Sequence, residues 1–181
     1  MLGLSIPTKW TAAAAAAVIV LCLAGCGSAA APAPASHPDA RRFLSVDAAA
    51  RTVRLSVVLG YGQTATQNID GANKGALGFV VPVGWKVLFE CVDRLAPARY
   101  ACALVPAPGT AEAQHGVTYI LHPAQGLSAG RSATFAFAPT APARYRIVGL
   151  AHLNGSWVAL AGMWVVLRVT AGGVPRAHWL R

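Results

Sequence analysis

Residues 144–170, RYRIVGLAHLNGSWVALAGMWVVLRVT, decide which fold we expect. The two ends of this stretch, 144–150 and 164–169, are rich in β-branched and apolar residues, a composition typical of strands. The part between them carries Gly, Asn and Ser, which favour turns and loops. We therefore predict two neighbouring strands that are separated by a loop.

The chain between residues 43 and 137 has the same β-rich character. In TVRLSVVL, residues 52–59, apolar residues alternate with Thr, Arg and Ser, and a period of two predicts a half-buried strand. Further short runs between Gly, Pro and Asn predict strands at 43–47, 77–81, 85–92, 100–105, 117–121 and 132–137. No segment after the N-terminal region has a convincing helical pattern. The predicted fold class is all-β, a sandwich of two sheets.

The N-terminal region resembles a bacterial lipoprotein export signal. Lys9 precedes an apolar run that is too short for a membrane span and that closes with Leu23-Ala24-Gly25-Cys26. In such signals the cysteine becomes the lipidated first residue, so we expect lipidation of Cys26; a plain secretory signal cleaved nearby is the alternative. The expected location is outside the cytoplasm, lipid-anchored to a bacterial membrane and facing the periplasm or the cell exterior.

Composition then divides the chain into four parts. Residues 1–25 are the expected signal peptide, and residues 26–40 are an Ala/Pro-rich tether that cannot bury a core. Residues 41–172 are the expected domain, and residues 173–181 are a C-terminal tail.

Two cysteines remain for the domain, Cys91 and Cys102. An exported protein meets an oxidising compartment, where a disulfide is the usual state of such a pair; two buried free thiols are the alternative. Strand alternation places Cys91 on the core side, and Cys102 would face it if its own face is also the core. Facing sheets lie about 10 Å apart, whereas a disulfide joins Cα atoms about 5.5–6 Å apart, so the bridge needs a place where the layers converge.

The net charge is +9, with 15 Lys and Arg against six Asp and Glu. The arginines are scattered, without a basic run or interleaved aromatic residues, so we expect no nucleic-acid partner. A basic face toward anionic lipid or an acidic partner suits a protein that is tethered beside a membrane. Arginines that only keep an apolar domain soluble are the alternative.

Two motifs resemble the sulfocyanin branch of the cupredoxins, the blue copper proteins. The first is Ala161-Gly162-Met163-Trp164, followed by an alternating apolar strand. The second is NIDGANKGALGFVVPVGWKVLFECVD, residues 68–93, with the pattern Asn-x-Asp-Gly, Asn-x-Gly and Val-Pro-x-Gly-Trp-x-Val. Both occur in the family's order and together span roughly residues 50–170. The resemblance implies a cupredoxin-like Greek-key β-sandwich with a metal-binding loop between its last two strands.

The same resemblance indicates a copper site that has lost most of its ligands. A type-1 copper site uses two imidazoles, a thiolate and a weak thioether. The family's ligand positions fall on Tyr100, Gly149, Val158 and Met163, and only Met163 matches. A lone thioether is a poor ligand and no thiolate remains, so we expect Tyr100 and Val158 to fill the site and no cofactor to be bound.

Copper held by other residues is the alternative. His152 lies in the same stretch as Met163, and this pair could hold Cu(I), which soft sulfur suits. His115 and His122 bracket a predicted strand, and Cys102 could donate sulfur if it is unpaired. The protein would then be a copper-binding electron-transfer protein with altered ligands.

Enzymatic motifs are missing from the sequence, which has no Gly-x-Ser-x-Gly, no His-Glu-x-x-His and no phosphate loop. Its six acidic residues are dispersed, and Asp70 sits in turn chemistry. We therefore expect a non-catalytic binding or accessory module. The resemblance implies a protein partner at the end that carries Trp157, Met163 and Trp164, to which Trp85 adds apolar surface.

Overall fold

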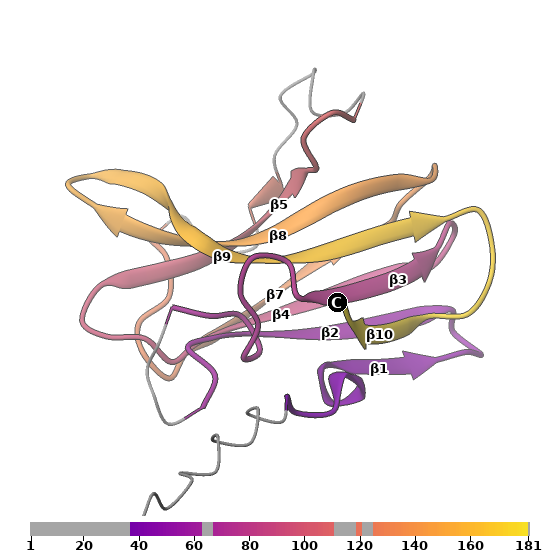
Figure 1. The fold of residues 1–181 in the computed structure, drawn as a ribbon, viewed down its shortest axis with the longest axis horizontal. Coiled ribbons are helices and arrows are strands. Elements are labelled where there is room, and N and C mark those ends of the chain that lie inside the picture. The colour runs from indigo at the N-terminus through magenta and orange to yellow at the C-terminus, as the bar shows by residue number, and fades with distance from the viewer. Residues whose placement is uncertain (1–36, 63–66, 111–118, 121–124, 181) are drawn as a thin grey trace, which may run out of the picture. The chain divides into compact units, whose positions relative to one another are not determined.

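The computed structural model describes residues 37–62, 67–110, 119–120 and 125–180. Within these ranges the chain forms two sheets and one short 3₁₀ helix, η1 (Ala40–Phe43) (Figure 1). The four-stranded sheet has the order β1 (Leu44–Asp47), β2 (Thr52–Leu59), β4 (Lys86–Asp93), β7 (Ser132–Phe137). The six-stranded sheet has the order β10 (Arg176–Trp179), β3 (Leu77–Pro82), β9 (Ser156–Thr170), β8 (Ala143–Leu153), β5 (Arg99–Pro106), β6 (Tyr119–Ile120).

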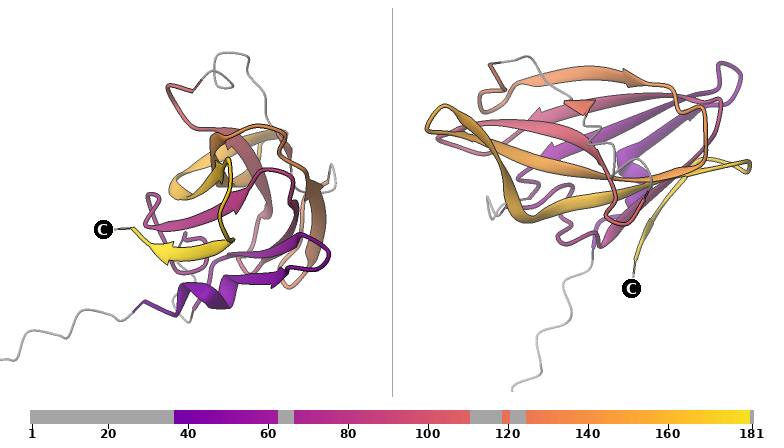
Figure 2. Two further views of the ribbon diagram at one scale, coloured as in Figure 1. Left: turned by 90° about the vertical axis from the view of Figure 1, so that its right-hand side faces the viewer. Right: turned by 90° about the horizontal axis from the view of Figure 1, so that it is seen from above.

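Both sheets are mixed, and they lie face to face (Figure 2). β2 runs parallel to β4 and β3 runs parallel to β9, whereas the other neighbouring strands are antiparallel. The chain changes sheet after β2, β3, β4, β6 and β7, so the two layers are built from interleaved parts of the sequence. Parallel neighbours require such crossovers, because a tight hairpin can join only antiparallel strands.

The core lies between the two sheets. Along β4, every second residue is buried, so Val87, Phe89 and Cys91 point inward while Lys86 is exposed. The largest fully buried side chains come from both layers and include Leu55, Leu59, Phe79, Phe89, Ile147 and Leu167. β2 and β7 have the bounds predicted from sequence. The predicted all-β sandwich is confirmed.

The folded unit extends beyond the predicted limits of 41 and 172 at both ends. Residues 176–179, expected within a tail, form β10, which pairs with β3 from Arg176–Val80 to Trp179–Leu77. The Trp179 indole Nε1 donates a hydrogen bond to the Pro38 carbonyl (2.7 Å), and the His37 ring stacks on Trp179 at 4.2 Å. The tail and the end of the tether therefore hold each other against the sandwich.

Several predicted features lie outside the described residues. These are the signal peptide, Cys26, most of the tether, His115, His122 and most of the strand at 117–121. Among the residues that the structure does describe, no helix has the length and apolar character needed to cross a membrane.

Candidate functional site

The predicted metal-binding loop is instead the end of a long β-hairpin. β8 and β9 continue past Leu150 and pair as far as Leu153 with Ser156, leaving only Asn154 and Gly155 as the turn. Both turn residues have positive φ angles, 50° and 81°. Asn-Gly favours this kind of two-residue turn, whose twist matches that of the strands. The turn therefore allows the strands to continue where we expected a loop.

The hairpin is interrupted by a large bulge at Gly149. Val148 pairs with Trp164, but Leu150 pairs with Ala159, so residues 160–163 lie opposite Gly149 alone. Within the bulge Gly162 has a φ of +76°, a conformation that glycine adopts without a steric penalty. The bulge resets the alternation of β9, and Met163 points into the core with none of its surface exposed.

The Met163 side chain occupies the space beside Gly149. A Cβ atom placed on Gly149 would lie 2.8 Å from Met163 Sδ and 2.9 Å from its terminal methyl. Real Cβ contacts are not this short, so a side chain at 149 would force Met163 to move. At the position where the family has a cysteine, this chain therefore has no thiolate, and the Met163 thioether occupies the space.

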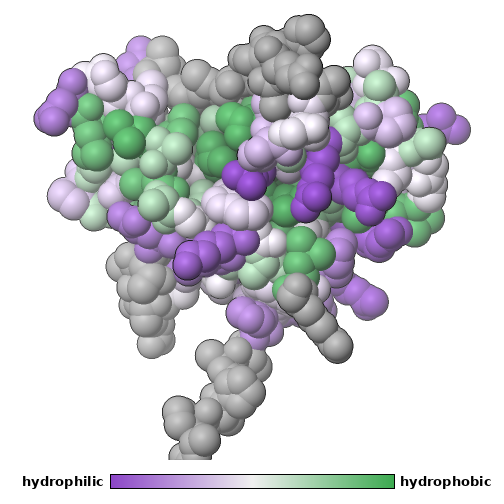
Figure 3. Space-filling view, turned by 45° about the horizontal axis from the view of Figure 1, so that its top comes forward, coloured by the Kyte–Doolittle hydropathy of each residue, from purple (hydrophilic) through white to green (hydrophobic). Residues whose placement is uncertain are grey.

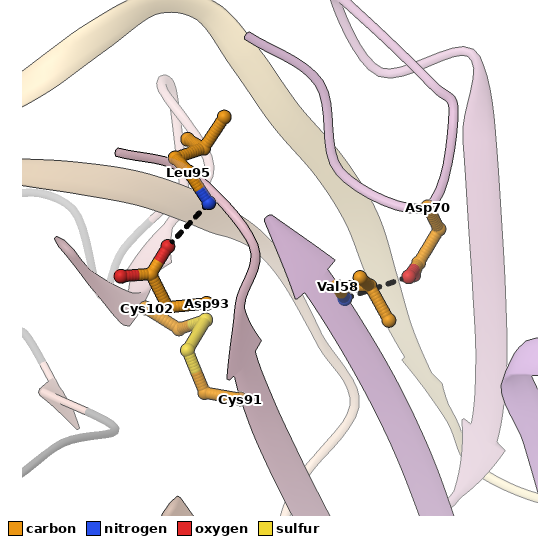
Figure 4. Close-up of a disulfide and its surroundings, with 6 residues drawn as sticks. All are labelled: Val58, Asp70, Cys91, Asp93, Leu95 and Cys102. Atoms are coloured by element: carbon orange, nitrogen blue, oxygen red, sulfur yellow. Dashed lines mark hydrogen bonds between the residues drawn. A yellow bond between two sulfur atoms is a disulfide. The ribbon is translucent and has the colours of Figure 1, made fainter. Parts of the chain in front are cut away.

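Cys102 lies beside this position, because it is the β5 residue paired with Gly149. Its sulfur forms a disulfide with Cys91 of β4, with the two Cα atoms 6.0 Å apart (Figure 4). The predicted disulfide is confirmed, and it joins the two sheets where their strands converge. The alternative of free thiols is wrong, and Cys102 has no thiolate to offer a metal.

The other two family positions do not complete a site. Tyr100 is partly buried against the main core, and its backbone exchanges two hydrogen bonds with Leu127 (3.1 and 2.8 Å). Val158 pairs with Ala151 near the hairpin turn and is 45% exposed. The expectation that Val158 fills the pocket is therefore wrong, because the hairpin carries it to the surface.

The alternative pair, His152 and Met163, is not brought together. His152 is exposed, and its ring contacts that of Trp157 with centroids 5.0 Å apart. His152 lies two residues after Leu150 in β8, so the two side chains point to the same face of the sheet. Leu150 packs with Trp157 in a small cluster outside the main core. Met163 belongs to the main core, so the two side chains lie on opposite faces of the sheet. Among the described residues no group of three His, Cys, Asp or Glu side chains could hold a metal ion. These residues do not fit a type-1 copper site.

The expected apolar end surface is also divided. Met163 and Trp85 pack in or against the main core. Trp164 is half-buried, with the Arg146 guanidinium 4.1 Å from its ring centroid. A Cβ on Gly75 would lie 2.1 Å from Trp164, so that glycine leaves the space in which the indole sits. Of the four residues in this expected surface, Trp157 and Trp164 retain exposed surface on the outer face, and Met163 cannot contribute to it.

Two aspartates are buried in the fold, Asp93 beside the disulfide and Asp70 near the end of β2 (Figure 4). Asp70 accepts a hydrogen bond from the Val58 backbone N–H (2.7 Å), and its second carboxylate oxygen is buried without a partner among the described residues. Burial raises the pKa of Asp70 well above its usual range, opposed by that hydrogen bond. The Asp70 carboxylate joins its loop to the backbone near the end of β2, at Val58, which agrees with the turn role indicated by the sequence.

Asp93 was missed by sequence reasoning. It continues the inward face of β4 and is fully buried, accepting a hydrogen bond from the Leu95 N–H (2.8 Å). Burial raises the pKa of Asp93 to about 6, and the Leu95 hydrogen bond opposes the increase. The alternation Val87, Phe89, Cys91 predicts an inward Asp93 if it is carried one step further.

No protein-family model matches the chain, and no characterised protein matches it by sequence. Solved structures of auracyanins and rusticyanins match the chain in structure. Dithionite-reduced auracyanin from the photosynthetic bacterium Roseiflexus castenholzii is 18% identical, over 65% of this chain and 96% of its own, with a TM-score of 0.38.

Two further matches are of the same kind. Auracyanin A, a blue copper protein from the green thermophilic photosynthetic bacterium Chloroflexus aurantiacus, is 14% identical over 66% of this chain and 99% of its own, with a TM-score of 0.42. Reduced rusticyanin is 12% identical over 70% and 88%, also with a TM-score of 0.42. At these values the likeness is loose, and it assigns neither a family nor an activity to this chain.

Proposed function

We propose that this protein is an exported, lipid-anchored cupredoxin-type domain that has lost its copper site and acts as a non-catalytic binding or accessory module. The observation that carries the proposal is the packing of Met163 on Gly149. A copper site needs a thiolate at that position and an open pocket for the ion. Here the glycine offers no ligand, and the thioether fills the space.

The anchor and the partner belong to the same proposal. Leu23-Ala24-Gly25-Cys26 supports lipidation of Cys26, and incorporation of a labelled fatty acid into the wild type but not into Cys26→Ala, in a bacterial host, tests it. Equal labelling of both would remove the anchor. A protein partner would contact the outer sheet face through Trp157 and Trp164, because Met163 is buried.

Copper content tests the central claim. The full chain is expressed in copper-supplemented medium, and its copper is measured by elemental analysis before and after reconstitution with Cu(I) and Cu(II). We expect far less than one copper per chain and no intense visible band from a thiolate–copper bond. A stoichiometric copper with such a band would refute the proposal.

A matched variant separates trace binding from a site with altered ligands. The double variant His152→Ala, Met163→Leu removes both alternative ligands, and Leu for Met conserves volume at a cost below about 1.5 kcal/mol. We expect wild type and double variant to carry the same small amount of copper. Copper that is stoichiometric in the wild type and lost in the double variant would instead support an electron carrier with altered ligands.

A further inference from the structure

A pocket of about 580 Å³ lies on the outer face of the six-stranded sheet. It is lined by residues of β3, β8, β9 and β10 and by Pro142 and Leu180. Its floor includes Val80 and Val166, which are only 4% and 7% exposed although they lie outside the main core cluster. A volume of this size lies within the range of small-ligand sites, about 300–1,000 Å³.

Three arginines from three different strands meet at this pocket. In the strand register Arg144 of β8 lies opposite Arg168 of β9, Arg168 lies opposite Val80 of β3, and Val80 lies opposite Arg176 of β10. Neighbouring strands are about 4.8 Å apart, so the three Cα atoms fall in one row across the sheet. All three arginines are exposed and line the pocket. The fold thus gathers charges that the sequence shows only as scattered residues.

The positive charge of this row is not balanced within the described part of the chain. The pocket lining contains no Asp or Glu. Arg144 and Arg168 are directly opposed, and like charges in that arrangement destabilise a sheet. No ion pair to these guanidinium groups is found among the described residues. An anionic ligand would relieve the repulsion.

His178 adds a polar group to the same lining. Its ring lies over Gly78, where a Cβ would come 3.3 Å from Cε1 and 3.4 Å from Nε2. The imidazole Nδ1 is buried and has no hydrogen-bond partner among the described residues. Buried polar atoms are nearly always hydrogen-bonded, so a rotation of the ring that turned this nitrogen toward the pocket would give it access to a ligand there.

We propose that this pocket binds a phosphate group carried by an organic molecule. A planar guanidinium donates two parallel hydrogen bonds to phosphate oxygens, and several cations around one pocket suit a multiply charged oxyanion. The valine floor suits an apolar part of the same molecule. Hydrophilic residues gather over the middle of this side of the molecule in Figure 3. The site is separate from the lost copper position, because Arg168 lies on the outer face of β9 and Met163 on the inner face.

Calorimetric titration of the full chain in neutral detergent tests the site. The probes are inorganic phosphate, glycerol 3-phosphate and short-chain phosphatidylglycerol, each against sodium chloride of equal ionic strength. Arg168→Gln and Arg176→Gln should each weaken binding about tenfold or more, because each removes a charge-assisted pair. Arg54→Gln is the matched control, since Arg54 is an exposed arginine of the other sheet.

The outcomes distinguish a soluble phosphate ester from a phospholipid headgroup, and both from the absence of a phosphate site. Equal affinity for glycerol 3-phosphate and the lipid assigns a soluble phosphate ester, and markedly tighter binding of the lipid assigns a phospholipid headgroup. No heat beyond that of chloride, or an equal loss in Arg54→Gln, would overturn the site. In low salt and without ligand, Arg168→Gln should have a higher melting temperature than Arg54→Gln. This result would show that the variant folds and that Arg144 and Arg168 repel each other in the wild type. Copper enters none of these readouts, so they are independent of the proposed function.

Discussion

At position 149 the absence of a side chain decides how the interior is filled. Met163 is buried with its thioether against Gly149, and Gly149 is the partner of the disulfide-bonded Cys102. Methionine adapts to irregular space because it is unbranched and flexible. Two sulfur-containing groups, the thioether and the disulfide, therefore fill this part of the core.

Asp93 makes the stability of the fold depend on pH. Its pKa is raised to about 6 by burial, whereas an aspartate in an unfolded chain titrates near 3.9. Between these values the folded protein holds the proton that the unfolded chain has released, so the contribution of Asp93 to stability is greatest below about pH 4 and is lost as pH rises through about 6. For Asp93→Asn we expect this fall, on the order of 2 kcal/mol, to disappear from urea unfolding measured at acidic and neutral pH.

The exposed Asp47→Asn is the control for this prediction. It removes the same charge at an exposed site, so a change shared by both variants would report the loss of charge and not the burial of Asp93. A residual fall toward higher pH should remain in Asp93→Asn, because Asp70 is also buried with a raised pKa. The same pH dependence in Asp93→Asn and in the wild type would show that Asp93 does not titrate in this way.

At the scale of elements, the β8–β9 hairpin replaces the loop that the family resemblance implied. Asn154-Gly155 is the strongest short hairpin signal in the chain, and it indicated the correct structure. The family pattern suggested otherwise, and the assignment of Val158 was made under that pattern. Four residues, Leu160 to Met163, lie opposite Gly149 alone, which is three more than regular pairing needs. Gly162 is the signal of the bulge in the sequence, because a glycine inside a strand pattern often marks such an irregularity.

The Cys91–Cys102 bridge is the covalent link between the two sheets. The cysteines are 11 residues apart in sequence, and closing so short a loop stabilises the fold by about 3 kcal/mol on the chain-entropy model. The double variant Cys91→Ala, Cys102→Ala should lose at least that much in the free energy of unfolding, measured with denaturant. Wild type under reducing conditions should show most of the same loss. A change below about 1 kcal/mol in both would mean that the bridge constrains little.

At the scale of the whole molecule, sequence predicts the layers better than their edges. Alternation in 52–59 predicts β2 with its observed bounds, and the short run between turn residues at 132–137 predicts those of β7. Arg176–Trp179 carries no such signal, because four residues form a strand only by pairing with the free edge of β3. The arginine row has the same origin: it exists only once β8, β9 and β10 are placed in register.

The C-terminal strand β10 protects the edge of the six-stranded sheet, so its removal should weaken the fold. β10 covers β3, and Trp179 ties it to Pro38. Deletion of residues 175–181 exposes the β3 edge, so the protein should unfold at lower denaturant and self-associate in size-exclusion chromatography. Trp179→Ala keeps the strand but removes a half-buried indole, with an expected loss of about 2 kcal/mol and no association. Val174→Ala, at a residue that is 69% exposed, should match the wild type. A monomeric deletion variant of full stability would show instead that the sandwich ends at β9.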